Sequence, residues 1–191
     1  MKKEPKYEIL KSLPPYGPMY VTVSDDGMES YSEGYVVKFF KSDSTEWIAN
    51  FKTGWSDFNC VHSFENTDLI VVISSGTCYL MHPDEIKPRN VFGVGYKSLL
   101  EKENGGLILE DQTNLTIIEE NGEIWHSERI SFDGFKDIKL KENIVSGFYY
   151  VPTSGDGQWT EFSLNLLTKE LLSGSSYIFN GNETKPWWKI W

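Results

Sequence analysis

Turn-forming residues interrupt this chain at short intervals, and that spacing is the strongest constraint on its fold. Glycine and asparagine accept the positive φ angles that tight hairpin turns need. Short runs of β-branched and aromatic residues, which fit a pleated sheet, lie between the turns. The turn signals are Asp25-Asp26-Gly27, Ser75-Gly76, Asn104-Gly105-Gly106, Asn121-Gly122, Asp133-Gly134, Ser154-Gly155-Asp156-Gly157 and Asn180-Gly181. The pattern predicts a succession of antiparallel β hairpins.

A weak repeat emerges when the apolar runs are aligned. Each unit has a polar lead-in, an apolar strand, a turn and a second strand. The first strands open at Tyr35, Leu69, Leu107 and Ile144, which are 34, 38 and 37 positions apart, and the second strands lie around Trp47, Tyr79, Ile117 and Trp159. A period of about 40 residues with four short strands is typical of a β-propeller blade. We predict an all-β fold, a propeller-like antiparallel meander of about four repeated units, with a β-sandwich as the alternative.

The length of 191 residues suits one domain with its own hydrophobic core. We expect a single β domain over residues 1–191, with residues 1–18 as a possible N-terminal extension. Residues 69–73 are apolar on both faces, which predicts a central strand covered on both sides. Helical turns fit only three short stretches, at residues 6–13, 96–102 and 165–172.

The chain is acidic, with 18 lysines and arginines against 28 aspartates and glutamates and a net charge of −10. Such a chain repels nucleic acid phosphates and attracts basic proteins, although acidity also serves solubility. We expect a basic protein partner and no nucleic acid. The first 20 residues lack the apolar segment of a signal peptide, and no apolar run approaches a membrane span. With only two cysteines, a cytoplasmic location without membrane contact is the expectation.

Two pairs of residues have the chemistry of zinc ligands, namely Cys60 with His62 and Cys78 with His82. Each pair would share one face of a strand. The run at residues 69–73 is expected to lie between them as a strand, which would separate the pairs by about 10 Å. Buried cysteines also serve as small hydrophobic residues. We therefore predict no metal and no cofactor.

The signals for catalysis are weak. His126, Ser131 and Asp133 lie close in sequence, but no Gly-x-Ser-x-Gly elbow is present. Paired carboxylates are unavoidable among 28 acidic residues, and sequence alone singles out no pair. Four aspartates are expected at or beside turns, where they accept backbone hydrogen bonds, namely Asp111, Asp133, Asp137 and Asp156. We predict no catalytic residues, with carboxylate-based enzyme chemistry as an alternative.

Two tryptophans are the best candidates for partner binding. In a strand over residues 124–130, Trp125 shares its face with polar residues, and in a strand over residues 159–166 Trp159 does the same. Phe162, Leu164 and Leu166 would form the opposite, buried face of the second strand. Exposed aromatic residues are typical anchors of protein interfaces and also stack on sugar rings.

Residues 122–177 contain a series of short motifs. Its landmarks are Trp125-His126, Ile130-Ser131-Phe132-Asp133-Gly134-Phe135, Val145-Ser146-Gly147, Trp159-Thr160-Glu161-Phe162-Ser163-Leu164 and Gly174-Ser175-Ser176-Tyr177. This series of motifs resembles the sequences of a group of small, uncharacterised bacterial β proteins, some of which are associated with toxin–immunity loci. This resemblance implies an immunity protein that binds and blocks a toxin domain. A charge of −10 would suit a basic toxin domain.

The sequence thus predicts a non-enzymatic binding protein. Its leading role is that of an immunity protein for a basic toxin domain. A carbohydrate- or small-ligand-binding module and an enzyme with carboxylate chemistry are the alternatives.

Deletion of residues 186–191 is predicted to lower the melting temperature by several degrees. This segment contains Trp187, Trp188 and Trp191, and tryptophans at a chain end are expected to pack on the domain. Each buries on the order of 200 Å² when packed. Thermal unfolding of the truncated and full-length proteins tests this prediction. An unchanged melting temperature with loss of partner binding would identify the segment as an interface instead.

Overall fold

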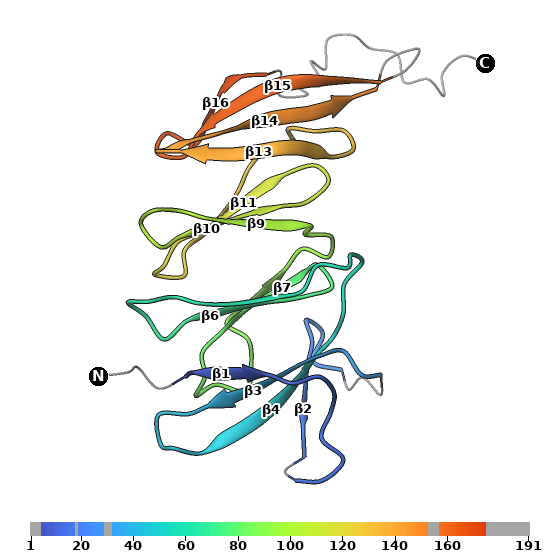
Figure 1. Cartoon of the computed structure of the whole chain (residues 1–191), viewed down its shortest axis with the longest axis vertical. Coiled ribbons are helices and arrows are strands. Elements are labelled where there is room, and N and C mark those ends of the chain that lie inside the picture. Colours follow the sequence, from blue (N-terminus) through green and yellow to red (C-terminus); the bar gives the residue numbers. More distant parts are fainter. Residues whose placement is uncertain (1–4, 18, 29–31, 153–156, 175–191) are drawn as a thin grey trace, which may run out of the picture. The chain divides into compact units, whose positions relative to one another are not determined.

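The computed structural model describes residues 5–17, 19–28, 32–152 and 157–174. These residues form sixteen β-strands in four four-stranded sheets and contain no helix, which confirms the all-β prediction. Accordingly, no helix long and apolar enough to cross a membrane occurs in the described part of the chain. The chain divides into two compact units, Met1–His126 and Ser127–Trp191. The first contains three of the sheets and the second contains one (Figure 1).

Sheet A is the first sheet of the N-terminal unit, with the strand order β1-β3-β4-β2. Its strands are β1 (Tyr7–Ile9), β2 (Val21–Val23), β3 (Tyr35–Phe40) and β4 (Glu46–Phe51). The β3–β4 hairpin turns where the Asp43 carboxylate accepts a hydrogen bond from the Thr45 backbone N–H. β2 pairs in parallel with β4, whereas the other pairs in this sheet are antiparallel.

Sheets B and C are antiparallel meanders whose strands follow chain order. Sheet B contains β5 (Cys60–Ser63), β6 (Ile70–Ser74), β7 (Thr77–Met81) and β8 (Asn90–Phe92). Sheet C contains β9 (Ser98–Glu101), β10 (Leu107–Glu110), β11 (Leu115–Ile118) and β12 (Ile124–His126). The β6–β7 turn is the predicted Ser75-Gly76 pair, with φ angles of 45° and 88°. Positive φ at both positions is what a two-residue hairpin turn requires.

Sheet D forms the C-terminal unit. It contains β13 (Phe135–Lys141), β14 (Ile144–Val151), β15 (Gln158–Asn165) and β16 (Glu170–Ser173), again in chain order. Phe162 and Leu164 of β15 are buried, as is Leu166 just beyond it, while Trp159 on the opposite face is exposed. The strand faces predicted for residues 159–166 are therefore confirmed.

The predicted repeat corresponds to the inner strands of the sheets. Its first strands are β3, β6, β10 and β14, and its second strands are β4, β7, β11 and β15. In each sheet these two strands occupy the centre of the strand order. The sequence period therefore marks four four-stranded units of the kind that a propeller blade contains.

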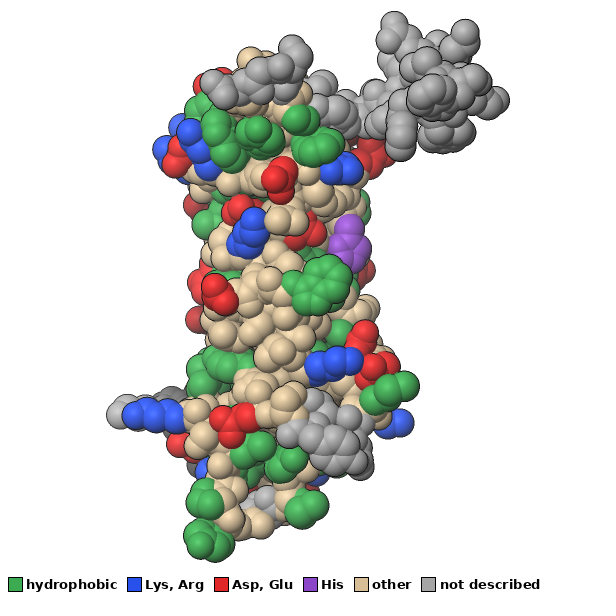
Figure 2. All heavy atoms as spheres, turned by 90° about the vertical axis from the view of Figure 1, so that its right-hand side faces the viewer, with side chains coloured by type: hydrophobic (Ala, Val, Ile, Leu, Met, Phe, Trp, Pro, Cys, Tyr) green, Lys and Arg blue, Asp and Glu red, His purple; other side chains and the backbone are tan. Residues whose placement is uncertain are grey.

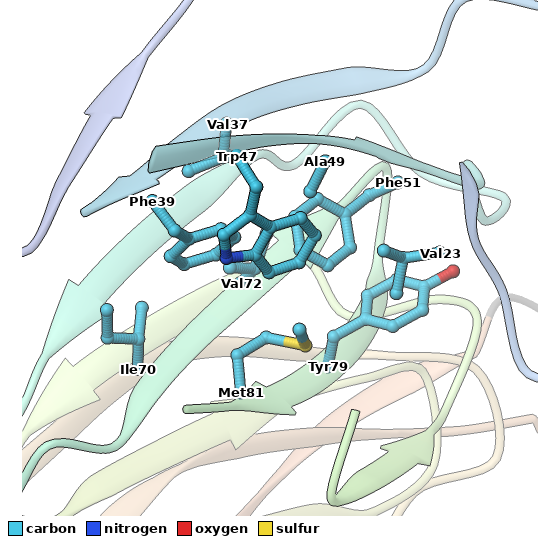
Figure 3. Close-up of a cluster of buried hydrophobic side chains, with 10 residues drawn as sticks. All are labelled: Val23, Val37, Phe39, Trp47, Ala49, Phe51, Ile70, Val72, Tyr79 and Met81. Carbon is cyan, nitrogen blue, oxygen red and sulfur yellow. The ribbon is translucent and has the colours of Figure 1, made fainter. Parts of the chain in front are cut away.

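Two hydrophobic clusters cover the two faces of sheet B. The first joins it to sheet A and contains Val23, Val37, Phe39, Trp47, Ala49, Phe51, Ile70, Val72, Tyr79 and Met81 (Figure 3). The second joins it to sheet C and includes Leu69, Val71, Ile73, Cys78, Leu80, Leu107, Leu109 and Ile118. Successive residues of β6 thus enter opposite clusters. This confirms that residues 69–73 form a central strand covered on both sides.

Two of the three stretches predicted as short helical turns are strands, so the prediction was wrong for them: residues 6–13 contain β1 and residues 96–102 contain β9. Residues 165–172 contain the β15–β16 turn, in which the Lys169 N–H donates to the Asn165 carbonyl oxygen, as in a single helical turn. Each of the strands pairs with a neighbour, whose backbone hydrogen bonds override a weak local preference. The strand expected over residues 124–130 is also shorter, because β12 ends at His126. The C-terminal tryptophans lie outside the described residues.

Replacing Phe51 with Ala should lower the free energy of unfolding by about 3–5 kcal/mol, since its fully buried ring lies in the cluster between sheets A and B. Its ring centroid is 5.0 Å from that of Tyr79. Trp55, which is 86% exposed, is the control, and its replacement by Ala should change stability by less than about 0.5 kcal/mol. Urea unfolding followed by circular dichroism measures both. Equal decreases in the free energy of unfolding of the two variants would contradict the assignment of Phe51 to the hydrophobic core.

Candidate functional site

The negative charge of the chain is concentrated in its N-terminal unit. Residues 1–126 contain 11 lysines and arginines against 20 aspartates and glutamates, a net charge of −9. Residues 127–191 contain 7 against 8, a net charge of −1. Most of the net negative charge therefore belongs to the first unit.

An acidic cleft of about 470 Å³ lies in that unit, at the edge strands β5 and β9 and the turns beside them. Its described lining consists of His62, Ser63, Glu65, Asn66, Glu101, Lys102, Glu103, Asn104, Gly105 and Glu120. Four glutamates thus face a single lysine among these residues. They come from loops and strand ends, where side chains are free of the requirement to pack in the core.

Hydrogen bonds and ion pairs hold the walls of the cleft. His62 Nδ1 lies 3.1 Å from Glu101 Oε1. The Glu120 carboxylate accepts hydrogen bonds from the backbone and side-chain amides of Asn66 at 2.7–3.0 Å. Lys102 Nζ donates to both oxygens of the Glu119 carboxylate, at 2.6 and 2.8 Å. The lysine of the cleft is thereby neutralised, and the potential of the cleft remains negative.

A second acidic group of this unit lies at the turn after β2. The pKa of Asp26 is lowered to about 2, first by the hydrogen bond from the Met28 N–H and then by Lys52 and Ser24. Lys52 Nζ is 2.9 Å from Asp26 and 3.8 Å from Asp25. This carboxylate stays ionised throughout the physiological pH range.

The second candidate surface is the aromatic face of sheet D. We use this name for Lys136, Lys139, Ser146, Phe148, Tyr150, Trp159, Glu161, Ser163 and Ser173, which share one side of the sheet by strand register. The ring centroids of Trp159 and Tyr150 are 5.5 Å apart. Lys136 Nζ lies 5.1 Å from the Trp159 centroid and 5.7 Å from the Phe148 centroid. The lysine thus bridges two aromatic rings through cation–π contacts.

A groove of about 380 Å³ opens on this face beside a β-bulge. The bulge places Asp137 and Ile138 opposite the single residue Gly147 of β14. Asp137 has φ 53° and is one of the residues that line the groove. A Cβ at Gly147 would lie 3.0 Å from the Lys136 carbonyl oxygen, so glycine permits the close approach of the bulged strand.

The two tryptophans singled out from the sequence lie in different units. Trp159 is 41% exposed and belongs to the aromatic face of sheet D. Trp125 is half-buried in β12 and pairs with Ile117, which in turn pairs with Ile108. Both isoleucines are buried. Trp125 therefore shares its face with apolar residues.

Sequence reasoning missed Trp55, which is more exposed than either of them. Trp55 lies in the loop between β4 and β5, where its backbone N–H donates to the Val94 carbonyl oxygen at 2.6 Å. Its side chain is 86% exposed. The signal in the sequence was a tryptophan placed among turn-forming residues, in Gly54-Trp55-Ser56-Asp57.

The two Cys/His pairs considered for metal binding are separated by a strand. Cys60 in β5 and Cys78 in β7 flank Ile73 of β6, so the strand expected between them is present. Burial raises the pKa of both thiols. Among the described residues, no group of three or more His, Cys, Asp and Glu side chains is arranged to hold a metal ion.

Of the residues considered for a nucleophilic triad, His126 and Ser131 form hydrogen bonds with other groups. His126 Nδ1 lies 2.9 Å from Thr116 Oγ1. Ser131 is fully buried, and its hydroxyl donates to the Gly134 carbonyl oxygen and accepts from the Tyr150 N–H. The Ser131 hydroxyl thus closes the turn before β13.

Two surfaces of different chemistry therefore stand as candidate sites, one acidic and one aromatic with balanced charge. Figure 2 shows acidic and hydrophobic side chains interspersed on one side of the molecule. No protein-family model, curated protein or solved structure was found to match this chain.

Proposed function

We propose that this protein is a non-catalytic binding protein whose partner is a basic protein, held by the acidic surface of residues 1–126. The observation that supports this most is the concentration of charge, a net of −9 in the unit that contains the acidic cleft. Clustered negative charge steers a positive partner during encounter and disfavours nucleic acid. Blocking a basic toxin domain is the specific role that we propose, in keeping with the resemblance of residues 122–177.

The cleft suits the long cationic side chains of lysine and arginine. Four glutamates line it, so that an entering cation meets carboxylates from three chain segments, namely Glu65, Glu101 with Glu103, and Glu120. Arginine forms paired hydrogen bonds with a carboxylate in such surroundings. The neutralised Lys102 presents little opposing charge.

Charge alone accelerates association more than it strengthens binding, and affinity needs apolar anchors. Trp55 meets this need within the same unit, because 86% of its side chain is available for contact. Val94, whose carbonyl receives the Trp55 N–H, is itself 43% exposed. Together they provide an apolar contact point in the acidic unit.

Replacing Glu65, Glu101 and Glu103 with glutamine should slow association with the basic domain encoded beside this protein by about tenfold at low salt. The matched control replaces Glu8, Glu46 and Glu85, which lie outside the cleft, and leaves the same net charge of −7. The control should change the rate by less than about threefold. Surface plasmon resonance at roughly 50 and 300 mM salt measures both, and the wild-type rate should fall at high salt.

Equal slowing by the two triple variants would contradict binding at the cleft. Absence of binding to any basic protein encoded nearby would contradict the function itself. Co-expression supplies the biological readout, since the protein should protect cells from the toxic activity of that domain and the cleft variant should protect less.

A further inference from the structure

We propose that the aromatic face of sheet D binds a neutral saccharide. This inference does not depend on the proposed function, because it concerns the other unit and a ligand of another class. It rests on three features of that face, namely an aromatic row with an exposed tryptophan and two half-buried rings, a groove with balanced charge, and a regularly paired backbone beneath both.

The aromatic row offers apolar contact area of the kind that sugar rings use. Trp159, Tyr150 and Phe148 come from the two central strands, β14 and β15. Trp159 is 41% exposed, and Tyr150 meets it edge to face at an interplanar angle of 65°. The C–H face of a pyranose ring is apolar and buries its area well against such rings.

The groove beside the row offers both donors and acceptors of hydrogen bonds. Lys139, Ser146, Ser163 and Ser173 form one row across all four strands of the sheet by register. The Ser163 and Ser173 hydroxyls lie 2.8 Å apart. Serine hydroxyls donate and accept, as the hydroxyls of a sugar do, so that each can match a ligand hydroxyl.

The charges of this face cancel, which distinguishes a neutral ligand from an ionic one. Lys136 and Lys139 are balanced by Asp137 and Glu161. A phosphate or sulfate would meet two carboxylates, and a cation would meet two ammonium groups. A neutral ligand meets neither penalty and uses all four groups as hydrogen-bonding partners.

The backbone beneath the groove is held in one conformation. β14 and β15 pair without interruption over eight residues, from Ile144↔Asn165 to Val151↔Gln158. Lys136 is held between two rings, and the bulge fixes Asp137. A preformed site loses little entropy on binding. Its volume of about 380 Å³ also lies in the range of small-molecule sites.

The test is binding of the full-length protein to a panel of neutral oligosaccharides of glucose, xylose and N-acetylglucosamine, with sialylated and sulfated oligosaccharides as charged counterparts. Titration calorimetry should detect at least one neutral ligand. Trp159→Ala should weaken its binding at least about tenfold. Trp55→Ala, which removes an exposed tryptophan from the other unit, should change it less than about twofold.

Glu161→Gln provides a second variant that keeps the shape of the groove, and it should weaken binding about threefold or more. Circular dichroism melting confirms that each variant is folded. Failure of every neutral oligosaccharide to bind would overturn the proposal, as would equal weakening by Trp55→Ala or binding of the charged oligosaccharides alone. The cleft variants with glutamine at positions 65, 101 and 103 should bind the saccharide normally, which separates this result from the binding of a basic protein.

Discussion

The N-terminal unit depends on the burial of the β6–β7 hairpin from both sides. Ile70 and Val72 pack towards sheet A, while Leu69, Val71 and Ile73 pack towards sheet C. A small four-stranded sheet has too little area to be stable with one face in water, so each outer sheet needs the central one. Apolar burial on this scale is the dominant favourable term in folding.

The turn of this hairpin also organises the loops around it. Gly54 N–H donates to the Ser74 carbonyl oxygen, and Tyr96 N–H donates to the Gly76 carbonyl oxygen. The Tyr79 hydroxyl reaches the Lys52 carbonyl oxygen at 2.8 Å. The loop that carries Trp55 is therefore anchored to the core hairpin. The acidic cleft lies where the sheets end, at the edge strands β5 and β9, so the core fixes the position of both features.

Much of the fold follows from local sequence patterns. The turn signal at Ser75-Gly76 and the two-faced apolar run at residues 69–73 are local features, and both predicted the structure correctly. The strands β1 and β9 were read as helical turns because their identity depends on partners remote in sequence. The face of Trp125 was misjudged for the same reason, since its neighbour Ile117 lies on another strand.

The candidate sites were less accessible from sequence than the fold. The cleft joins His62 to Glu120 across 58 positions, and no local motif connects them. The uneven charge is visible only once the boundary at His126 is known. The bulge at Asp137 was interpreted as a turn-associated aspartate, because nothing nearby in the sequence signals a change of register. Trp159, by contrast, was identified from simple alternation along β15.

Hydrogen exchange of the backbone amides tests the central role of the β6–β7 hairpin most directly. The amides of Val71, Val72, Tyr79 and Leu80 should be the slowest to exchange in residues 1–126, and they should exchange together, through unfolding of the whole unit. Edge strands such as β1 and β8 should exchange faster, through local opening. Two results would contradict this account. One is exchange of the hairpin amides as fast as those of the edge strands. The other is hairpin amides that stay protected after all amides of sheet A or of sheet C have exchanged.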